Sequence, residues 1–231
     1  MAISVTTAPS DTAKVGGVFE RYFKRGFVHR ELYTSPSIFA AEMHVLFGST
    51  WVYVAHETEI PNANDFVTRT IGRRPVIVSR SRDGSINVVV NRCTHRGAVV
   101  CRETRGNASR FSCAYHAWTY ANDGRCVGIP LRHAYGPDFE LSDQNLLQVP
   151  RVESYRGFIF ACMNPEIQPL AAHLAGAREC LDAWLDRGDR NPVIVRNGEM
   201  QFTTHANWKT IYDNAGDGYH PPFSHDSMLR V

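Results

Sequence analysis

Hydrophobic and polar residues alternate along the middle of the chain in a pattern that predicts short β-strands. Four such runs cover Trp51–Ala55, Phe66–Ile71, Pro75–Ser79 and Ile86–Asn91. Asp83-Gly84 separates the last two runs and is typical of a hairpin turn. Asp123-Gly124 indicates a second hairpin after Trp118–Tyr120, and Gly157–Met163 forms a further apolar run. The pattern therefore predicts a small antiparallel β domain between about residues 50 and 163.

Helical patterns flank this β region on both sides. Ser35 and Pro36 are typical of a helix start, and a helical apolar face follows, comprising Ile38, Phe39, Met43, Leu46 and Phe47, with Gly48 at its end. A second helix is expected over 169–187, with Leu170, Leu174, Ala177, Leu181 and Leu185 on one face and Gly188 as its C-cap. A third is expected over 206–220, where Pro221-Pro222 ends it.

These patterns divide the chain into four parts. Residues 1–17 are expected to form a disordered tail, 18–50 a helical segment, 51–165 the β domain and 166–231 a further, mainly helical region. A strand-like run at 192–196 precedes the last helix. The chain stops soon after this helix without a closing element, so we expect a fragment or a truncation with uncovered apolar surface.

Composition excludes several classes of protein. The 231 residues are 43% hydrophobic and 21% charged, enough for a buried core, and the net charge is only +2 without an evident basic stripe. A nucleic-acid partner is therefore not expected. No apolar run approaches the roughly 18 residues of a membrane span, and no secretory signal is recognisable, so a cytoplasmic protein is expected. Six cysteines in a chain of this length indicate free or metal-bound thiols rather than a disulfide framework.

Two Cys-His pairs form the first candidate site. Cys93-x-His95 is followed by Cys113-x-x-His116, and each pair comes directly after a β run. Two facing loops of this kind can hold a two-iron cluster, with thiolates on one iron and neutral imidazoles on the other, which raises the reduction potential. Gly97 would let the backbone approach the sulfides, and the neighbouring Arg96 and Trp118 could flank the cluster.

A structural zinc ion is the alternative for the same four residues, because tetrahedral Cys₂His₂ sites are common. Zinc fingers, however, usually pair Cys with Cys and His with His, whereas mixed pairs on β-hairpin loops are the Rieske arrangement. Cys101 lies between the pairs and is expected to be an ordinary thiol. The other three cysteines, Cys126, Cys162 and Cys180, are expected to be core residues.

A carboxylate and two histidines near the last helix form the second candidate site. Asp217 lies three residues before His220, so on a helix the two would share a face. Pro221-Pro222 would turn the chain and bring His225 beside His220. Two imidazoles beside a carboxylate, with open positions, are typical of non-haem iron oxygenases. Each residue alone has a simpler reading as a solvated or capping side chain, and Asp213 could serve the same helix face.

With both sites in view, the chain resembles the large (α) subunit of Rieske non-haem iron aromatic-ring-hydroxylating dioxygenases, from about residue 18 to the end. The motifs NRCTHRGA, SCAYHAW and NWK…DNAGDGYHPPFSH are similar to that family's cluster and iron motifs in order and spacing. The compact DNAGDGYH spacing is most similar to benzoate and anthranilate oxygenases. The resemblance implies an α+β fold, with an antiparallel β Rieske [2Fe–2S] domain and flanking helices before the start of an α/β, helix-grip-like catalytic domain.

The resemblance also assigns roles to the candidate residues. Cys93 and Cys113 would hold one iron of the cluster, and His95 and His116 the other. A mononuclear Fe(II) would have two of its three ligands here, His220 and His225. Asp217 would link one of them to a cluster histidine of a neighbouring subunit in a homotrimer or an α₃β₃ assembly, and Asn214 would lie close to the iron.

Three positions depart from the family pattern. Ala117 stands where the family usually has Gly, and Asp213 stands where it usually has Glu. The family's third iron ligand, an acid, lies beyond Val231, and Asp226 is a weak substitute because it directly follows a ligand. The expected function is that of a terminal oxygenase, which takes electrons from a ferredoxin or reductase and uses O₂ to hydroxylate an aromatic substrate, with carboxylated aromatics among the candidates. The alternatives are a Rieske electron-carrier module without catalysis and a zinc-stabilised interaction module.

Overall fold

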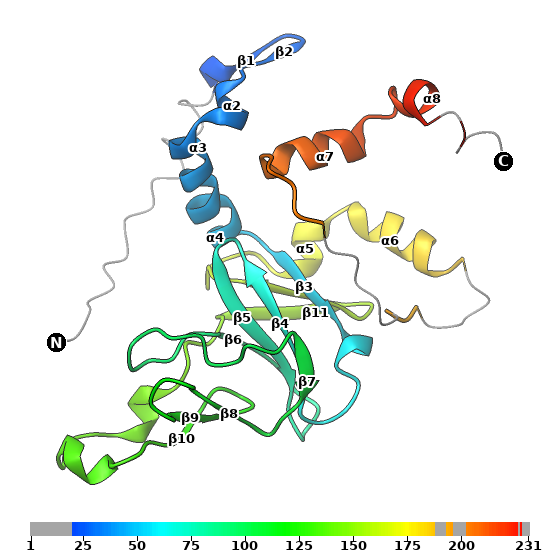
Figure 1. Ribbon diagram of the computed structural model, residues 1–231. Coiled ribbons are helices and arrows are strands. Elements are labelled where there is room, and N and C mark those ends of the chain that lie inside the picture. Colours follow the sequence, from blue (N-terminus) through cyan, green and yellow to red (C-terminus); the bar gives the residue numbers. More distant parts are fainter. Residues whose placement is uncertain (1–19, 188–192, 196–201, 226, 228–231) are drawn as a thin grey trace. The chain divides into compact units, whose positions relative to one another are not determined.

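The computed structural model describes residues 20–187, 193–195, 202–225 and 227 of the chain (Figure 1). It divides into two compact units, each described by itself below. The β unit is Glu42–Glu199, and the helical unit combines Met1–Ala41 with Met200–Val231. Helices and antiparallel sheets occur together, as the sequence predicted.

The β unit contains three antiparallel sheets, with strand orders β6-β5-β4-β7, β11-β12-β3 and β10-β9-β8. The strands are β3 (Val52–His56), β4 (Asp65–Ile71), β5 (Arg74–Arg80), β6 (Ile86–Val90), β7 (Arg105–Asn107), β8 (Arg110–Ser112), β9 (Thr119–Ala121), β10 (Cys126–Gly128), β11 (Arg151–Tyr155) and β12 (Phe158–Cys162). Both predicted hairpins are confirmed: Asp83-Gly84 joins β5 to β6, and Asp123-Gly124 joins β9 to β10. Gly84 and Gly124 have φ values of 87° and 89°, which favour glycine.

The four-stranded sheet separates two hydrophobic cores, because alternate residues of a strand point to opposite faces. On β5, Val76 and Val78 belong to the core shared with β3 and β12, whereas Ile77 belongs to the core around the two candidate cluster loops. Val88 and Val89 of β6 divide in the same way. The sheet is thus buried on both faces, and the core on one face includes Cys93 and Cys113 of the candidate cluster loops.

Short helical turns complete the β unit. They are η2 (Glu42–Leu46), α4 (Phe47–Ser49), η3 (Glu57–Glu59), η4 (Arg132–Tyr135), η5 (Leu141–Gln144), α5 (Leu170–Leu174) and α6 (Ala177–Leu185). The single helix expected over 169–187 was wrong: Ala175, with φ 43°, and Gly176 break it into α5 and α6. The core position expected for Cys180 was also wrong. Cys180 is exposed, on the same face of α6 as the half-exposed Trp184.

The helical unit contains η1 (Glu20–Tyr22), β1 (Phe23–Lys24), β2 (Phe27–Val28), α2 (Glu31–Thr34), α3 (Pro36–Ala41), α7 (Trp208–Gly216) and α8 (Pro221–Ser224). The predicted helix start is confirmed, because α3 begins at Pro36 and the Ser35 hydroxyl accepts the Ile38 N–H at 3.4 Å. Tyr33 of α2 donates its hydroxyl to Asp213 of α7 at 2.6 Å. This contact joins two segments of the unit that lie far apart in the sequence.

The helix expected over 206–220 is shorter than predicted. Asn207 caps α7 by accepting the Lys209 N–H at 3.1 Å, and α7 ends at Gly216. Glycine has low helix propensity, so the sequence Gly216-Asp217-Gly218 favours an end at this point. Pro221 then starts α8 instead of ending the earlier helix. Several apolar side chains of this part of the chain are exposed, as expected: Phe202, Ile211, Tyr212, Tyr219 and Phe223.

Some expectations fall on residues outside the described ranges. They are the tail over 1–17, the C-cap at Gly188 and the ligand alternative Asp226. Of the run expected to be a strand at 192–196, only 193–195 are described, and these three residues form neither helix nor strand. Within the described ranges, no helix has the length and apolar character needed to cross a membrane.

Candidate metal centres

The first candidate cluster loop is a tight turn that begins at Cys93. The Cys93 N–H donates to the Ala98 carbonyl at 2.8 Å, and the Gly97 N–H donates back to the Cys93 carbonyl at 2.8 Å. Gly97 has a φ of 72°, a left-handed conformation that glycine adopts without strain. The loop therefore points the side chains of Cys93 and His95 from a fixed backbone.

The second loop repeats this hydrogen-bond pattern. The Cys113 N–H donates to the Trp118 carbonyl at 2.8 Å, and the Ala117 N–H donates to the Cys113 carbonyl at 2.9 Å. Ala117 occupies the position equivalent to Gly97 and has a φ of 55°. The methyl group of Ala117 thus has a steric cost of about 1 kcal/mol at this position. The two loops match in backbone geometry, although His95 follows its cysteine by two residues and His116 follows its cysteine by three.

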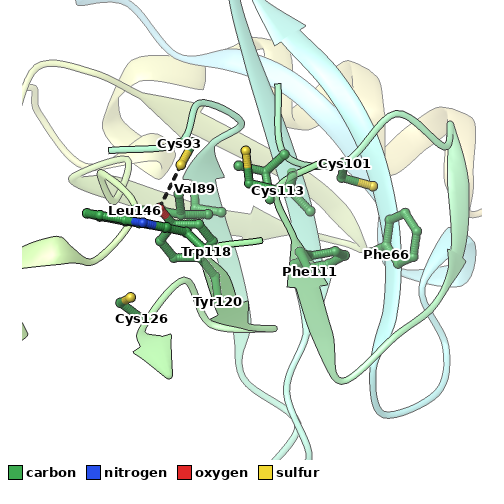
Figure 2. Close-up of a cluster of buried hydrophobic side chains, with 12 residues drawn as sticks. Phe66, Val89, Cys93, Cys101, Phe111, Cys113, Trp118, Tyr120, Cys126 and Leu146 are labelled. Carbon is green, nitrogen blue, oxygen red and sulfur yellow. Dashed lines mark hydrogen bonds between the residues drawn. The ribbon is translucent and has the colours of Figure 1, made fainter. Parts of the chain in front are cut away.

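The two cysteines lie beside each other in a buried position. Cys93 is 4% exposed and Cys113 is 3% exposed, and Figure 2 shows both at the same end of a buried cluster of side chains. Burial raises the pKa of Cys93, the hydrogen bond with Tyr120 lowers it, and the neighbouring Cys113 raises it. The Tyr120 hydroxyl is 3.1 Å from the Cys93 sulfur. Binding of a metal by the Cys93 thiol must therefore release a proton.

The two histidines face each other at the loop ends. Their ring centroids are 4.6 Å apart, with an interplanar angle of 70°. The His95 ring also stacks on Trp118, with centroids 4.8 Å apart and planes 8° apart. Burial lowers the pKa of His95, and the nearby His116 and Arg96 lower it further. His95 is therefore held in the neutral form that a metal ligand needs.

These four residues fit a Rieske-type [2Fe–2S] cluster. The Nδ1 atom of His95 is buried and has no hydrogen-bond partner, and such an atom is costly unless it binds something. In the described part of the chain, no group of three or more His, Cys, Asp or Glu residues is placed to hold a metal ion. A Rieske cluster does not need such a group, because each iron takes two protein ligands and bridging sulfides supply the rest.

Asp217, His220 and His225 of the second candidate site lie close together, but through a turn and not through a shared helix face as predicted. Asp217 lies just after α7 and His220 just before α8, so they do not share a helix face. A turn brings them together instead, with 3.2 Å between an Asp217 oxygen and His220 Nδ1. The His220 and His225 rings are 5.3 Å apart.

Asp217 is fixed and charged in this turn. It accepts the Tyr219 N–H at 2.8 Å, and this bond, followed by the interaction with His220, lowers the pKa of the carboxyl group. The contact with Nδ1 leaves Nε2 of His220 to bind a metal. His220 and His225 therefore fit two positions of an iron site. Asp217 contacts His220 Nδ1 and is not placed as a third ligand, since no group of three such side chains within the described residues is positioned to hold a metal ion.

Tyr120 is a site residue that the sequence analysis missed. It is fully buried in β9, and its hydroxyl contacts both Cys93 and Thr94. The only signal in the sequence was its position within a strand two residues after Trp118. Asn214, which the resemblance placed close to the iron, lies on α7 and is exposed.

The Rieske [2Fe–2S] domain family matches residues 50–155 of the chain. Anthranilate 1,2-dioxygenase large subunit of Acinetobacter baylyi (strain ATCC 33305 / BD413 / ADP1) is 41% identical over 205 residues, which cover 88% of this chain and 43% of that protein. The α subunit of N,N-dimethyl phenylurea N-demethylase of Sphingobium sp. (strain YBL2) is 40% identical, over 90% of this chain and 46% of that protein. The crystal structure of naphthalene 1,2-dioxygenase from Rhodococcus sp. bound to indole has a TM-score of 0.84 and 37% identity, over 94% of this chain and 50% of that chain.

The fold and the two matched loops thus define a Rieske [2Fe–2S] protein. More narrowly, the chain is homologous to the large subunits of Rieske dioxygenases, with 36–41% identity to those of anthranilate and toluate dioxygenases. It spans less than half the length of these curated relatives.

Proposed function

We propose that this chain is part of the terminal oxygenase component of a multicomponent aromatic-ring-hydroxylating dioxygenase. The observation that carries the proposal is the pairing of Cys93 with Cys113 and of His95 with His116 on two loops of the same backbone geometry. The dioxygenases among the relatives support it, since they are matched in a large subunit or a large oxygenase component. Their range, which includes an N-demethylase, leaves the substrate to experiment.

In this proposal each candidate site residue has one role. Cys93 and Cys113 hold one iron of the cluster, and His95 and His116 hold the other. The cluster supplies one-electron chemistry when it is bound. His220 and His225 are two ligands of a mononuclear Fe(II). Asp217 holds the His220 ring through Nδ1, which fixes its orientation and its tautomer and is suited to a proton shift during electron transfer.

The overall reaction takes one O₂, two electrons and two protons and gives a cis-dihydrodiol of the aromatic ring. A ferredoxin or reductase supplies the electrons one at a time. We propose a carboxylated aromatic as the first substrate to test, because anthranilate and toluate name the matched relatives. We further propose a Rieske domain at 51–165, the start of a catalytic domain at 166–231, a homotrimer or α₃β₃ assembly, and a cytoplasmic location.

A single-turnover experiment tests this function. The chain is loaded anaerobically with cluster and Fe(II), reduced with dithionite, freed of excess reductant, and mixed with O₂ and benzoate. We expect a dihydrodiol in proportion to the electrons stored, and none from the His220→Ala variant that keeps its cluster. Reoxidation of the cluster without product would contradict oxygenase activity of this chain.

An electron-carrier module is the second candidate, and one observation favours it. The described residues provide all four ligands of a cluster but only two ligands beside each other for the mononuclear iron. If the same experiment gives rapid reduction and reoxidation without product, carriage alone is supported.

A further inference from the structure

Positive charge is concentrated in the segment that carries the cluster ligands. Between Asn91 and His116 the chain has one acid, Glu103, and five arginines, namely Arg92, Arg96, Arg102, Arg105 and Arg110. This segment therefore carries a formal charge of +4, while the chain as a whole carries +2 and its other residues carry −2. The sequence analysis overlooked this because the total charge is small.

Part of this charge lines a groove beside the second cluster loop. The groove has a volume of about 470 Å³, and Arg102, Arg105 and Arg110 line it together with Glu103. Its apolar floor includes Phe66, Val100, Cys101 and Phe111, and it extends to Ala114. Ala114 directly follows the ligand Cys113, so the groove reaches the cysteine side of the cluster. Arg102 and Arg110 are exposed there.

Glu103 offsets one of the three arginine charges that line the groove. Its carboxylate accepts from its own neighbourhood, namely the Cys101 thiol at 3.5 Å and the Arg102 N–H at 3.2 Å. These bonds hold the acid against the local backbone. The groove therefore presents more positive than negative charge to solvent.

The histidine side of the cluster is different. A cavity of about 330 Å³ adjoins His95 and His116, and its other walls are Trp118, Pro130, Leu131, Ala134 and Tyr135. Among the residues that line this cavity, none is an acid, a lysine or an arginine. The lining of the groove on the cysteine side is thus basic, whereas the lining of the cavity on the histidine side is uncharged, although Arg96 lies near His95.

We propose that the basic groove formed by Arg102, Arg105 and Arg110 is the docking surface for an acidic one-electron donor protein. The inference rests on the proposed function and adds the face by which the electron enters. The donor loses one electron and the cluster gains one beside Cys113. Arginine is enriched at protein interfaces, and opposite charges on two partners increase the rate of encounter. The apolar floor favours a protein over a nucleic acid, whose phosphates do not pack against apolar surface.

Small charged oxidants test the groove without an identified donor. The cluster-loaded, reduced chain is mixed with hexacyanoferrate(III), an anion, or hexaammineruthenium(III), a cation, at an ionic strength of about 0.02 M, where charges act over roughly 20 Å. We expect Arg102→Glu and Arg110→Glu each to lower the rate at which the anion oxidises the cluster by about five- to tenfold, and to raise the rate of oxidation by the cation. Both rate changes should vanish near 0.5 M salt, where the screening length is only about 4 Å.

Arg178→Glu on α6 makes the same charge change outside the groove and is the matched control. We expect it to change either rate less than about twofold. Arg102→Gln and Arg110→Gln remove the charge without reversing it. They should change the logarithm of the oxidation rate about half as much, and they replace the glutamate variants if those disturb folding. Visible and EPR spectra confirm that each variant keeps its cluster.

Three results are decisive. Equal rates in the groove variants and the control, with intact clusters, would overturn the groove and leave the proposed function standing. Failure of the unchanged chain to bind a cluster would overturn the proposed function itself. Tight binding of a duplex oligonucleotide at about 0.15 M salt that the same substitutions abolish would also overturn the docking proposal, in favour of a nucleic-acid partner.

Discussion

The hydroxyl of Tyr120 lies 3.1 Å from the sulfur of Cys93, and neither residue is more than 4% exposed. Burial raises the pKa of Tyr120 well above its ordinary value, so the hydroxyl keeps its proton and can donate it to a metal-bound Cys93 thiolate. A hydrogen bond to a cluster sulfur stabilises the reduced, more negative state. The strand β9 therefore contributes to the redox properties of the loop before it.

We expect Tyr120→Phe to lower the reduction potential of the cluster by about 40 mV, which corresponds to ~1 kcal/mol for one electron. The substitution removes the hydroxyl and keeps the buried ring. Protein-film voltammetry measures the change. Tyr155→Phe, which removes a hydroxyl that donates to Asp182 at 2.7 Å, is the matched control and should leave the potential unchanged. An unchanged potential in Tyr120→Phe would show that the hydroxyl does not act on the cluster.

Ala117→Gly should stabilise the protein by about 0.5–1 kcal/mol. Ala117 has a φ of 55°, and glycine adopts this conformation without the clash of a Cβ atom. Urea unfolding of samples matched in iron content gives the change in unfolding free energy. Ala114→Gly in the same loop has no left-handed backbone to relieve and should be neutral or destabilising. A loss of stability in Ala117→Gly would mean that the methyl group makes favourable contacts that outweigh the strain.

Alkylation should distinguish the cysteines of the cluster-loaded chain. Cys180 is exposed, whereas Cys101, Cys126 and Cys162 are buried. Burial and the hydrogen bond with Glu103 raise the pKa of Cys101 to about 11, so its reactive thiolate is scarce at pH 8. We expect iodoacetamide at pH 8 to label Cys180 first, as peptide mass spectrometry would show. Labelling of Cys101 at the same rate as Cys180 would contradict the burial of this region.

Asp217→Asn should leave the visible and EPR spectra of the cluster intact and uncouple its reduction from product formation. The amide cannot balance the charge of an imidazolium or take part in the same proton shift as the carboxylate. The measurement is product formed per electron consumed, in the assembled oxygenase. Asp186→Asn, which changes an exposed acid paired with Arg156, is the control and should behave like the unchanged protein. Normal product formation by Asp217→Asn would remove this residue from the electron route.

Local signals in the sequence predicted much of the fold. The two Asp-Gly turns marked both hairpins, because glycine at positive φ is a local requirement. The alternating pattern located β3 to β6 to within a residue or two. The spacing of Cys93, His95, Cys113 and His116 was enough to predict which side chains meet, since strand ends set the position of a loop.

Errors arose where several local preferences compete. The leucine spacing over 169–187 predicted one helix, but the conformation at Ala175 and Gly176 ended α5 there. Helical spacing also explained the meeting of Asp217 and His220 wrongly, because two glycines beside Asp217 favour a turn that achieves the same contact. The hydroxyl contact of Tyr120 and the basic groove depend on the folding of distant segments together, so no spacing rule predicts them.

The most direct test of the account is the metal content and spectrum of the anaerobically purified chain. We expect the cluster to contribute two irons and two acid-labile sulfides per chain, in addition to any Fe(II) at His220 and His225, and to give a rhombic EPR signal with a low average g value after reduction with dithionite. Cys113→Ser should abolish both. A colourless protein with one zinc per chain and no such signal would contradict mixed sulfur and nitrogen ligation of a two-iron cluster, and would support a zinc-stabilised module instead.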